Sequence, residues 1–232
     1  MRRFLAVVAA LAATYAVAPA ATISGNGTYG DFSGTLTYAG INATSGTITV
    51  TLTNTSPIAN GGYLTGFAFN LSNLSGQVTG MTLVSSDPDF QLVGGSTFDN
   101  SVTVSPYGQS DVGAALGGNW TGGGSPNDGL GVGQSGTFTF TVTGTASFIA
   151  GLSDTALLGL LTDTTGPGGN QQDNFIVRFK GFNNGASDKV PDDPSGNVVG
   201  EPDVVPEPAT LVTVAVLGGM GLIGYRLRRK KA

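Results

Sequence analysis

The chain of 232 residues contains no cysteine and no histidine. These absences exclude disulfides, thiolate nucleophiles, Ser-His-Asp triads and zinc or copper sites built from Cys and His ligands. Glutamate is nearly missing too, since its only copies are Glu201 and Glu207 near the C-terminus. A glycosidase pair would therefore have to consist of aspartates. We expect no catalytic residues and no enzymatic activity, with an aspartate-based hydrolase as the enzymatic alternative.

Positive charge is scarce between the two ends of the chain. Apart from the first three and the last seven residues, the only cations are Arg178, Lys180 and Lys189. The interior is therefore more acidic than the formal net charge of -5 indicates. Such a surface repels phosphate backbones, so we expect no nucleic-acid partner.

Residues 205–232 have three parts in a fixed order. The segment Val205-Pro206-Glu207-Pro208 precedes the uncharged run 209–225, and a basic tail, 226–232, ends the chain. As a helix with about 1.5 Å rise per residue, the run would reach roughly 25 Å, close to the thickness of a hydrocarbon core. Its flanking cations would stop transfer and stay in the cytoplasm; they are Arg226, Arg228, Arg229, Lys230 and Lys231. The sequence thus predicts a transmembrane helix at 209–225, with the preceding chain outside.

This Pro-Glu-Pro motif, followed by a span and an Arg-rich end, resembles the PEP-CTERM sorting signal of Gram-negative bacterial surface proteins. In that family the signal is read by the exosortase, a membrane-embedded, transpeptidase-like cysteine protease. The resemblance implies that the chain is an exosortase substrate with a structural role at the cell surface or in an extracellular matrix of exopolysaccharide and biofilm. An ordinary tail anchor with a Pro-rich linker is the alternative.

The N-terminus has the features of a secretory signal peptide. Met1-Arg2-Arg3 is a positive start, residues 4–17 are apolar, and Ala18-Pro19-Ala20 is a small-residue cleavage site. We expect a signal peptide at 1–20, removed after Ala20 or Ala21. The exported precursor would be tethered in the inner membrane and then reach the cell surface or the exterior.

The body of the chain, 21–190, has a side-chain period of two. In 47–53 and 137–143 every second residue is threonine, so Ile48, Val50 and Leu52 would face a core. Further strands are expected at 34–39, 63–71, 78–85 and 101–105, with a last strand at 174–180. These patterns predict an all-β ectodomain, a single antiparallel β-sandwich of jelly-roll-like type. Residues 152–161 indicate either a helix or a buried strand.

The glycine-dense segment 113–136 is expected to be a long surface loop, and it holds the single tryptophan, Trp120. Its indole has two interpretations. It would stack on a sugar ring, or it would pack the loop onto the domain.

In 174–180, Arg178 and Lys180 would lie on one face of the strand and Phe175, Val177 and Phe179 on the other. The cations would form a solvated or edge-protecting surface. Alternatively, Arg178 and Lys180 would clamp an acidic polysaccharide, and the candidate glycan contacts are Trp120 and Arg178. The alternative function is therefore a carbohydrate-binding module displayed on the envelope.

Residues 191–204 are rich in Pro, Gly and Asp and are expected to form an extended spacer before the membrane. Calcium would find oxygen ligands there or at Asp87-Pro88-Asp89, but neither stretch follows the EF-hand pattern. We therefore expect no metal site and no cofactor, with calcium as the open alternative.

Overall fold

The computed structural model describes residues 20–71, 76–95, 98–121, 124–161 and 175–192. The predicted signal peptide up to residue 19, the spacer from residue 193 and the sorting signal at 205–232 lie outside these ranges. Within them, no helix is both long and apolar enough to cross a membrane.

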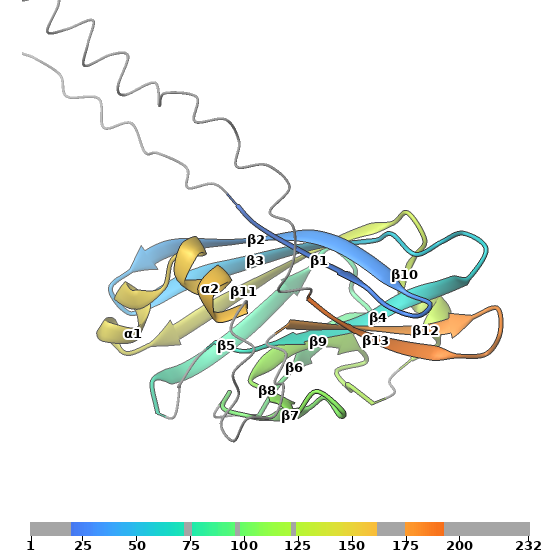
Figure 1. Ribbon diagram of the computed structural model, residues 1–232. Helices are drawn as coiled ribbons and strands as arrows, with labels where there is room; N and C mark the ends of the chain where they lie inside the picture. Colours follow the sequence, from blue (N-terminus) through green and yellow to red (C-terminus); the bar gives the residue numbers. More distant parts are fainter. Residues whose placement is uncertain (1–19, 72–75, 96–97, 122–123, 162–174, 193–232) are drawn as a thin grey trace, which may run out of the picture. The chain divides into compact units, whose positions relative to one another are not determined.

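The first sheet, called sheet A, is antiparallel throughout (Figure 1). Its strand order is β1-β2-β3-β11-β5. The strands are β1 (Ala21–Asn26), β2 (Asp31–Asn42), β3 (Ser45–Asn54), β11 (Ser135–Gly144) and β5 (Val78–Ser85).

The second sheet, called sheet B, has the order β13-β12-β4-β9-β6 and is also antiparallel. Its strands are β13 (Ser187–Pro191), β12 (Phe175–Phe182), β4 (Gly61–Phe69), β9 (Val112–Leu116) and β6 (Phe90–Val93). The short β10 (Leu130–Gly131) also pairs with β4. The two-residue strands β7 (Val102–Thr103) and β8 (Gln109–Ser110) pair only with each other.

The threonine-rich strands form the centre of sheet A as their alternation predicts. In β3, Ile48, Val50 and Leu52 are fully buried, and the threonines between them are half-buried. β11 is the direct neighbour of β3, with Phe138 opposite Val50 and Phe140 opposite Ile48. The prediction of a mainly β, antiparallel fold is confirmed for the described residues.

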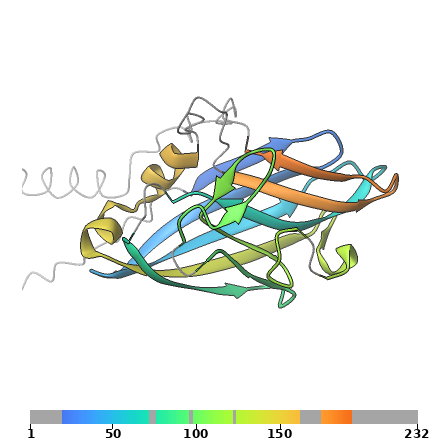
Figure 2. The same ribbon diagram turned by 90° about the horizontal axis from the view of Figure 1, so that it is seen from below.

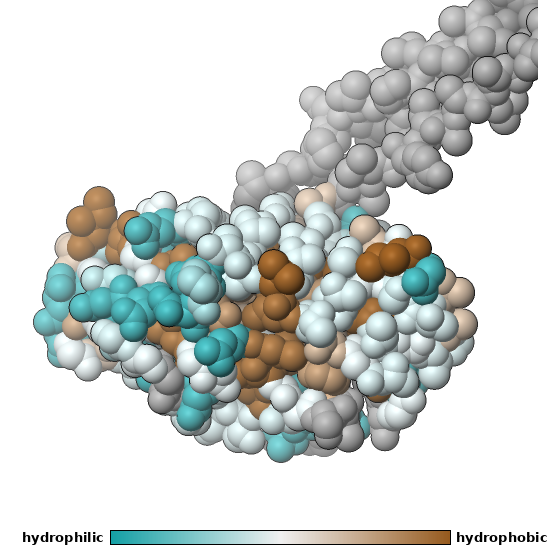
Figure 3. Space-filling view, turned by 180° about the vertical axis from the view of Figure 1, so that it is seen from behind, coloured by the Kyte–Doolittle hydropathy of each residue, from teal (hydrophilic) through white to brown (hydrophobic). Residues whose placement is uncertain are grey.

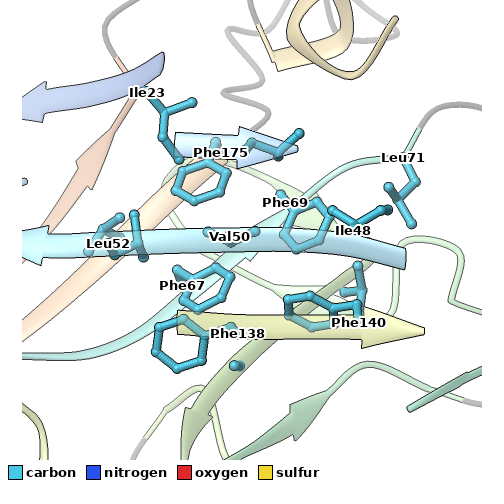
Figure 4. Packing of buried hydrophobic residues seen from close by; sticks show 14 of the residues in the cluster. Ile23, Ile48, Val50, Leu52, Phe67, Phe69, Leu71, Phe138, Phe140 and Phe175 are labelled. Carbon is cyan, nitrogen blue, oxygen red and sulfur yellow. The ribbon is translucent and has the colours of Figure 1, made fainter. Parts of the chain in front are cut away.

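The core lies between the two sheets and is rich in phenylalanine (Figure 4). Phe67 of β4 in sheet B meets Phe138 of β11 in sheet A edge to face, with 4.8 Å between ring centroids. On its other side Phe67 stacks with Phe175 of β12 at 5.7 Å. Edge-to-face and offset stacking are the favoured arrangements of aromatic rings. The inner faces of the two sheets are therefore joined by one aromatic cluster.

Two short helices follow β11 and lie against one end of sheet A (Figure 1). α1 (Ala146–Gly151) is capped by Thr145, whose side chain accepts a hydrogen bond from the Phe148 amide. α2 (Asp154–Leu161) places Leu157 in the core. Of the two interpretations of 152–161, the helix is therefore correct.

Three expectations about the strands are wrong. The segment 113–136 is not simply a surface loop, because β9 falls at its start and is buried along its whole length inside sheet B. β12 is not the last strand, since β13 follows and pairs with it. The strand expected at 101–105 is reduced to the two residues of β7.

The first and last strands are joined where the edges of the two sheets meet. Asp192 Oδ1 accepts a hydrogen bond from the Ser24 amide at 2.8 Å, and Asp188 Oδ2 accepts one from the Tyr29 amide at 2.8 Å. Unpaired edge amides of β1 and of the turn after it thereby find acceptors, which protects this edge from strand addition. The fold includes Pro191 and Asp192, two residues that the sequence assigns to the spacer.

Candidate functional site

All three interior cations lie on the outer face of sheet B. Phe175, Val177 and Phe179 of β12 point into the core, so Ile176, Arg178 and Lys180 point outward. In the register of β12 with β13, Lys189 lies directly opposite Arg178. The predicted split between charged and aromatic faces of β12 is thus confirmed, and β13 adds the third cation.

A second hydrophobic cluster covers the outer face of sheet B beside these cations. The segment 98–121 supplies Val102, Val104 and Trp120, which pack on Ala68, Ala115 and Ile176. Figure 2 shows the β7–β8 part of this segment beside β12 and β13. The residues of β4 and β9 in this cluster, Ala68 and Ala115, have small side chains.

Trp120 is packed down by this arrangement, and only 6% of its surface is exposed. The guanidinium carbon of Arg178 lies 6.0 Å from the centre of the indole ring, within the range of a cation–π contact. The structure therefore brings together the two residues that the sequence selects as candidate glycan contacts. It favours the packing interpretation of Trp120, because a stacking platform needs an exposed ring face.

Two polar atoms in this contact have no hydrogen-bond partner among the described residues. They are the indole Nε1 of Trp120 and the Nε of Arg178, and both are buried. Burying a donor without a partner costs about 1–3 kcal/mol. Unpaired groups of this kind call for a specific explanation in a folded protein.

The two lysines reach toward the loops that cover the sheet. Lys180 Nζ donates to the Thr121 carbonyl at 3.3 Å, and Lys189 Nζ donates to the Ser105 carbonyl. The Tyr107 hydroxyl donates to the Lys189 carbonyl at 3.1 Å. Residues 105–107 and Thr121, which lie before and after β9 in the chain, are thus bonded to the cationic strands.

Burial and mutual repulsion shift the pKa values of the three cations in the same direction. Burial lowers the pKa of the Arg178 guanidinium. The pKa of each lysine is lowered first by burial and second by the charge of Arg178. No carboxylate among the described residues contributes to these shifts. We call Arg178, Lys180 and Lys189 with the adjoining Trp120 the cationic site.

A β-bulge lies at this point of sheet B. Arg178 pairs with Gly66 and Phe179 with Leu64, so Thr65 is an extra residue on β4. Its hydroxyl donates to the Arg178 carbonyl at 3.3 Å. Bulges bend a strand locally and change the direction of neighbouring side chains. This bulge therefore helps to set how Arg178 projects from the sheet.

The aspartates most relevant to a hydrolase or a metal serve the fold. The buried Asp111 accepts from the Leu71 amide with one oxygen and from the Asn100 amide with the other, each at 2.8 Å. Burial raises the pKa of Asp111, while the two amide bonds lower it. Asp87 accepts from the Asp89 amide at 3.0 Å. Among the described residues no three metal-binding side chains gather.

Several sequence candidates lie outside the described residues. They are the motif residues Val205, Pro206, Glu207 and Pro208, and the stop-transfer cations Arg226, Arg228, Arg229, Lys230 and Lys231. Within the described residues, sequence reasoning selected Trp120 and Arg178 as glycan contacts and considered Lys180 beside Arg178 as a clamp for an acidic polysaccharide, but it gave Lys189 no such role. The sequence does contain a signal for grouping Arg178, Lys180 and Lys189, because they are the only cations between the two chain ends.

Comparison with known proteins gives no relative. No protein-family model, no curated protein and no solved structure matches the chain.

Proposed function

We propose that the protein is an exported structural component of the cell surface or extracellular matrix, sorted and processed by an exosortase through residues 205–208. The proposal includes a jelly-roll-like sandwich as ectodomain and a transmembrane helix at 209–225. It also includes export by the signal peptide, an inner-membrane-tethered precursor, and later display on the surface or release into an exopolysaccharide and biofilm matrix.

The observation that carries the proposal is the order of motif, span and basic tail after a folded unit. β13 ends at Pro191, so only a short segment separates the fold from the motif. At the other end β1 begins at Ala21, and removal of residues 1–20 would leave that strand whole. Cleavage after Ala20 would thus fall outside the described strands, and cleavage after Ala21 would remove only the first residue of β1.

The motif has a physical basis as a protease substrate. Pro206 and Pro208 restrict their own backbone and push the preceding residues out of the helical region. The chain is then extended at the membrane surface, where a protease can bind its backbone. Glu207 offers a negative charge to a basic pocket, and the basic tail fixes the depth at which the motif emerges.

The test separates recognition from topology. Pro206→Ala combined with Pro208→Ala leaves the span and its basic end unchanged, so the variant should insert normally and accumulate uncleaved. Pro194→Ala combined with Pro202→Ala is the matched control, because it removes two prolines from the spacer and should be processed like wild type. The readout is mass spectrometry of the C-terminal peptide in cells with and without an exosortase. Wild-type protein that keeps residues 226–232 in both strains would make the signal a plain anchor.

The carbohydrate-binding alternative is favoured by one observation: all three interior cations lie on the outer face of sheet B, with Lys189 opposite Arg178.

A further inference from the structure

We propose that the cationic site binds a carboxylate-bearing polysaccharide, held by Arg178, Lys180 and Lys189 on the outer face of sheet B. This inference goes beyond sorting at the C-terminus, because it assigns a ligand class to the ectodomain itself. Its test uses purified protein and needs no exosortase, so either proposal can fail while the other stands.

The geometry gives a row of charges along two strands. Arg178 and Lys189 are cross-strand partners, and residues directly opposite each other have Cβ atoms about 5 Å apart. Lys180 is the next outward residue of β12, about 7 Å along the strand. A row of cations at such spacings suits a ligand that repeats its negative charge along a chain.

Among the described residues, no carboxylate contributes to the pKa shifts of the row. The three cations repel one another, since the charge of Arg178 lowers the pKa of both lysines. An approaching polyanion would remove this repulsion, and a neutral polysaccharide would not.

The site also holds hydrogen-bond donors that the fold leaves unused. Trp120 Nε1 and Arg178 Nε have no partner, but both atoms are shielded from solvent, so the donors that a ligand can reach are those at the ends of Arg178 and the two lysines. A guanidinium binds a carboxylate through two parallel hydrogen bonds. Each lysine ammonium has three hydrogens and donates one of them to a loop carbonyl. Donors therefore remain for carboxylates and neighbouring hydroxyls.

The flanking loops favour a chain over a flat surface. Thr121 and Ser105 carry the carbonyls that the two lysines contact, so covering segments reach the row at both lysines. A linear polyanion can lie along β12 and β13 beside these segments. A membrane surface would have to approach all three cations at once past the same loops.

Binding is measured by calorimetry on the purified full-length chain in detergent. Polygalacturonate is the probe, dextran is the neutral polymer, and inorganic phosphate is the small anion. Lys180→Gln combined with Lys189→Gln should weaken polygalacturonate binding about tenfold or more, because two charged contacts are lost. Both lysines are partly exposed, so the fold should survive, and a circular-dichroism melt checks this.

A charge-relocation variant makes the test specific. Ile41→Lys and Val84→Lys are added to the double variant and restore its net charge on sheet A, at side chains that are 58% and 71% exposed. Figure 3 shows exposed apolar residues of this kind on a largely polar face. We expect the relocated charges not to restore binding.

Three results would overturn the proposal. The first is recovery of polygalacturonate binding by the relocated lysines, which would show that net charge alone acts. The second is binding of dextran as tight as that of polygalacturonate. The third is retention by vesicles of anionic lipid together with no polygalacturonate binding, which would assign the cations to a membrane. Weak phosphate binding and weakening by salt are both expected, since each charge contact is screened.

Discussion

Asp192 and Ser24 are joined by a hydrogen bond between residues 168 positions apart, from the Ser24 amide to the Asp192 carboxylate. Asp188 makes the same kind of bond with the amides of Tyr29 and Gly30. Carboxylates at the end of the folded unit thus satisfy backbone donors at its beginning. Hydrogen bonds to an ionised acceptor are stronger than those between neutral groups.

Removal of this bond should lower stability. Asp192 is 7% exposed, so Asp192→Ala leaves a shielded amide without its acceptor and should cost about 1–3 kcal/mol. The measurement is urea unfolding of residues 22–204, which we expect to be soluble and β-rich with or without reductant. Asp89→Ala, at an exposed turn position, is the control and should change little. Equal midpoints for the two variants would show that the Ser24 bond contributes no stability.

Gly113 should tolerate no side chain. A Cβ there would overlap the Phe67 carbonyl on the paired strand β4, so either β9 or β4 would have to move. Overpacking of this kind typically costs about 1–3 kcal/mol. Gly151→Ala is the matched control, because a Cβ at the end of α1 meets nothing within 4 Å. Similar unfolding midpoints for Gly113→Ala and Gly151→Ala would contradict the tight approach of β9 to β4.

Trp120 should behave as a core residue. Its fluorescence should resist acrylamide quenching in the native state and become accessible in urea, since the indole is 6% exposed. Trp120→Ala should cost about 3–5 kcal/mol, as large-to-small substitutions in cores do. Ready quenching of the native protein would show an open ring instead. Because the substitution destabilises the fold, loss of polysaccharide binding in Trp120→Ala is informative only with a stability measurement.

The lysines should titrate below their usual range. Residues 22–204 contain only Lys180 and Lys189, so NMR of labelled lysine Cε atoms follows both. Arg178→Gln should raise the pKa of each lysine by removing the charge of Arg178, and the part caused by burial should remain. Val84→Gln on sheet A is the control. Unchanged lysine titration in Arg178→Gln would show that the three cations do not interact.

The sign for stability follows from the direction of these shifts. A lysine whose pKa is lowered by folding binds its proton more weakly in the native state. This shift lowers the free energy of unfolding by its full amount when the pH is below the pKa of the folded state. The loss disappears as the pH rises to the pKa of the unfolded state. Arg178→Gln should therefore flatten the rise of stability with pH in the alkaline range.

The sequence was sufficient to predict a strand where apolar and polar residues alternate. Ile48, Val50 and Leu52 follow a strict period of two, and β3 is the result. β9 was missed because Gly113, Ala114 and Ala115 lack the β-branched and aromatic residues that mark strands. The strand forms there because small residues fit between β4 and β6, which is a property of the packing and not of local preference.

The cationic site was only half predictable. Arg178 and Lys180 share a strand face by local geometry, but the position of Lys189 depends on the register of β13 against β12. The environment of Trp120 depends on Ala68 and Ala115, which come from two strands of sheet B. Contacts between residues on different strands can be predicted only when the order of the strands in the sheet is known, and the sequence did not predict that order.

If the chain is exported as proposed, the bonds between β1 and the residues around β13 also set the order in which the fold can form. The N-terminus leaves the translocation channel first, and β1 can then pair with β2 as soon as residues 31–42 follow. Its outer amides must wait until Asp188 and Asp192 emerge. Contacts of such long sequence separation form late and slowly. In the proposed export, the fold would therefore be complete only when residues 187–192 have crossed the membrane, so the last part of the fold to arrive would close the open edge of β1.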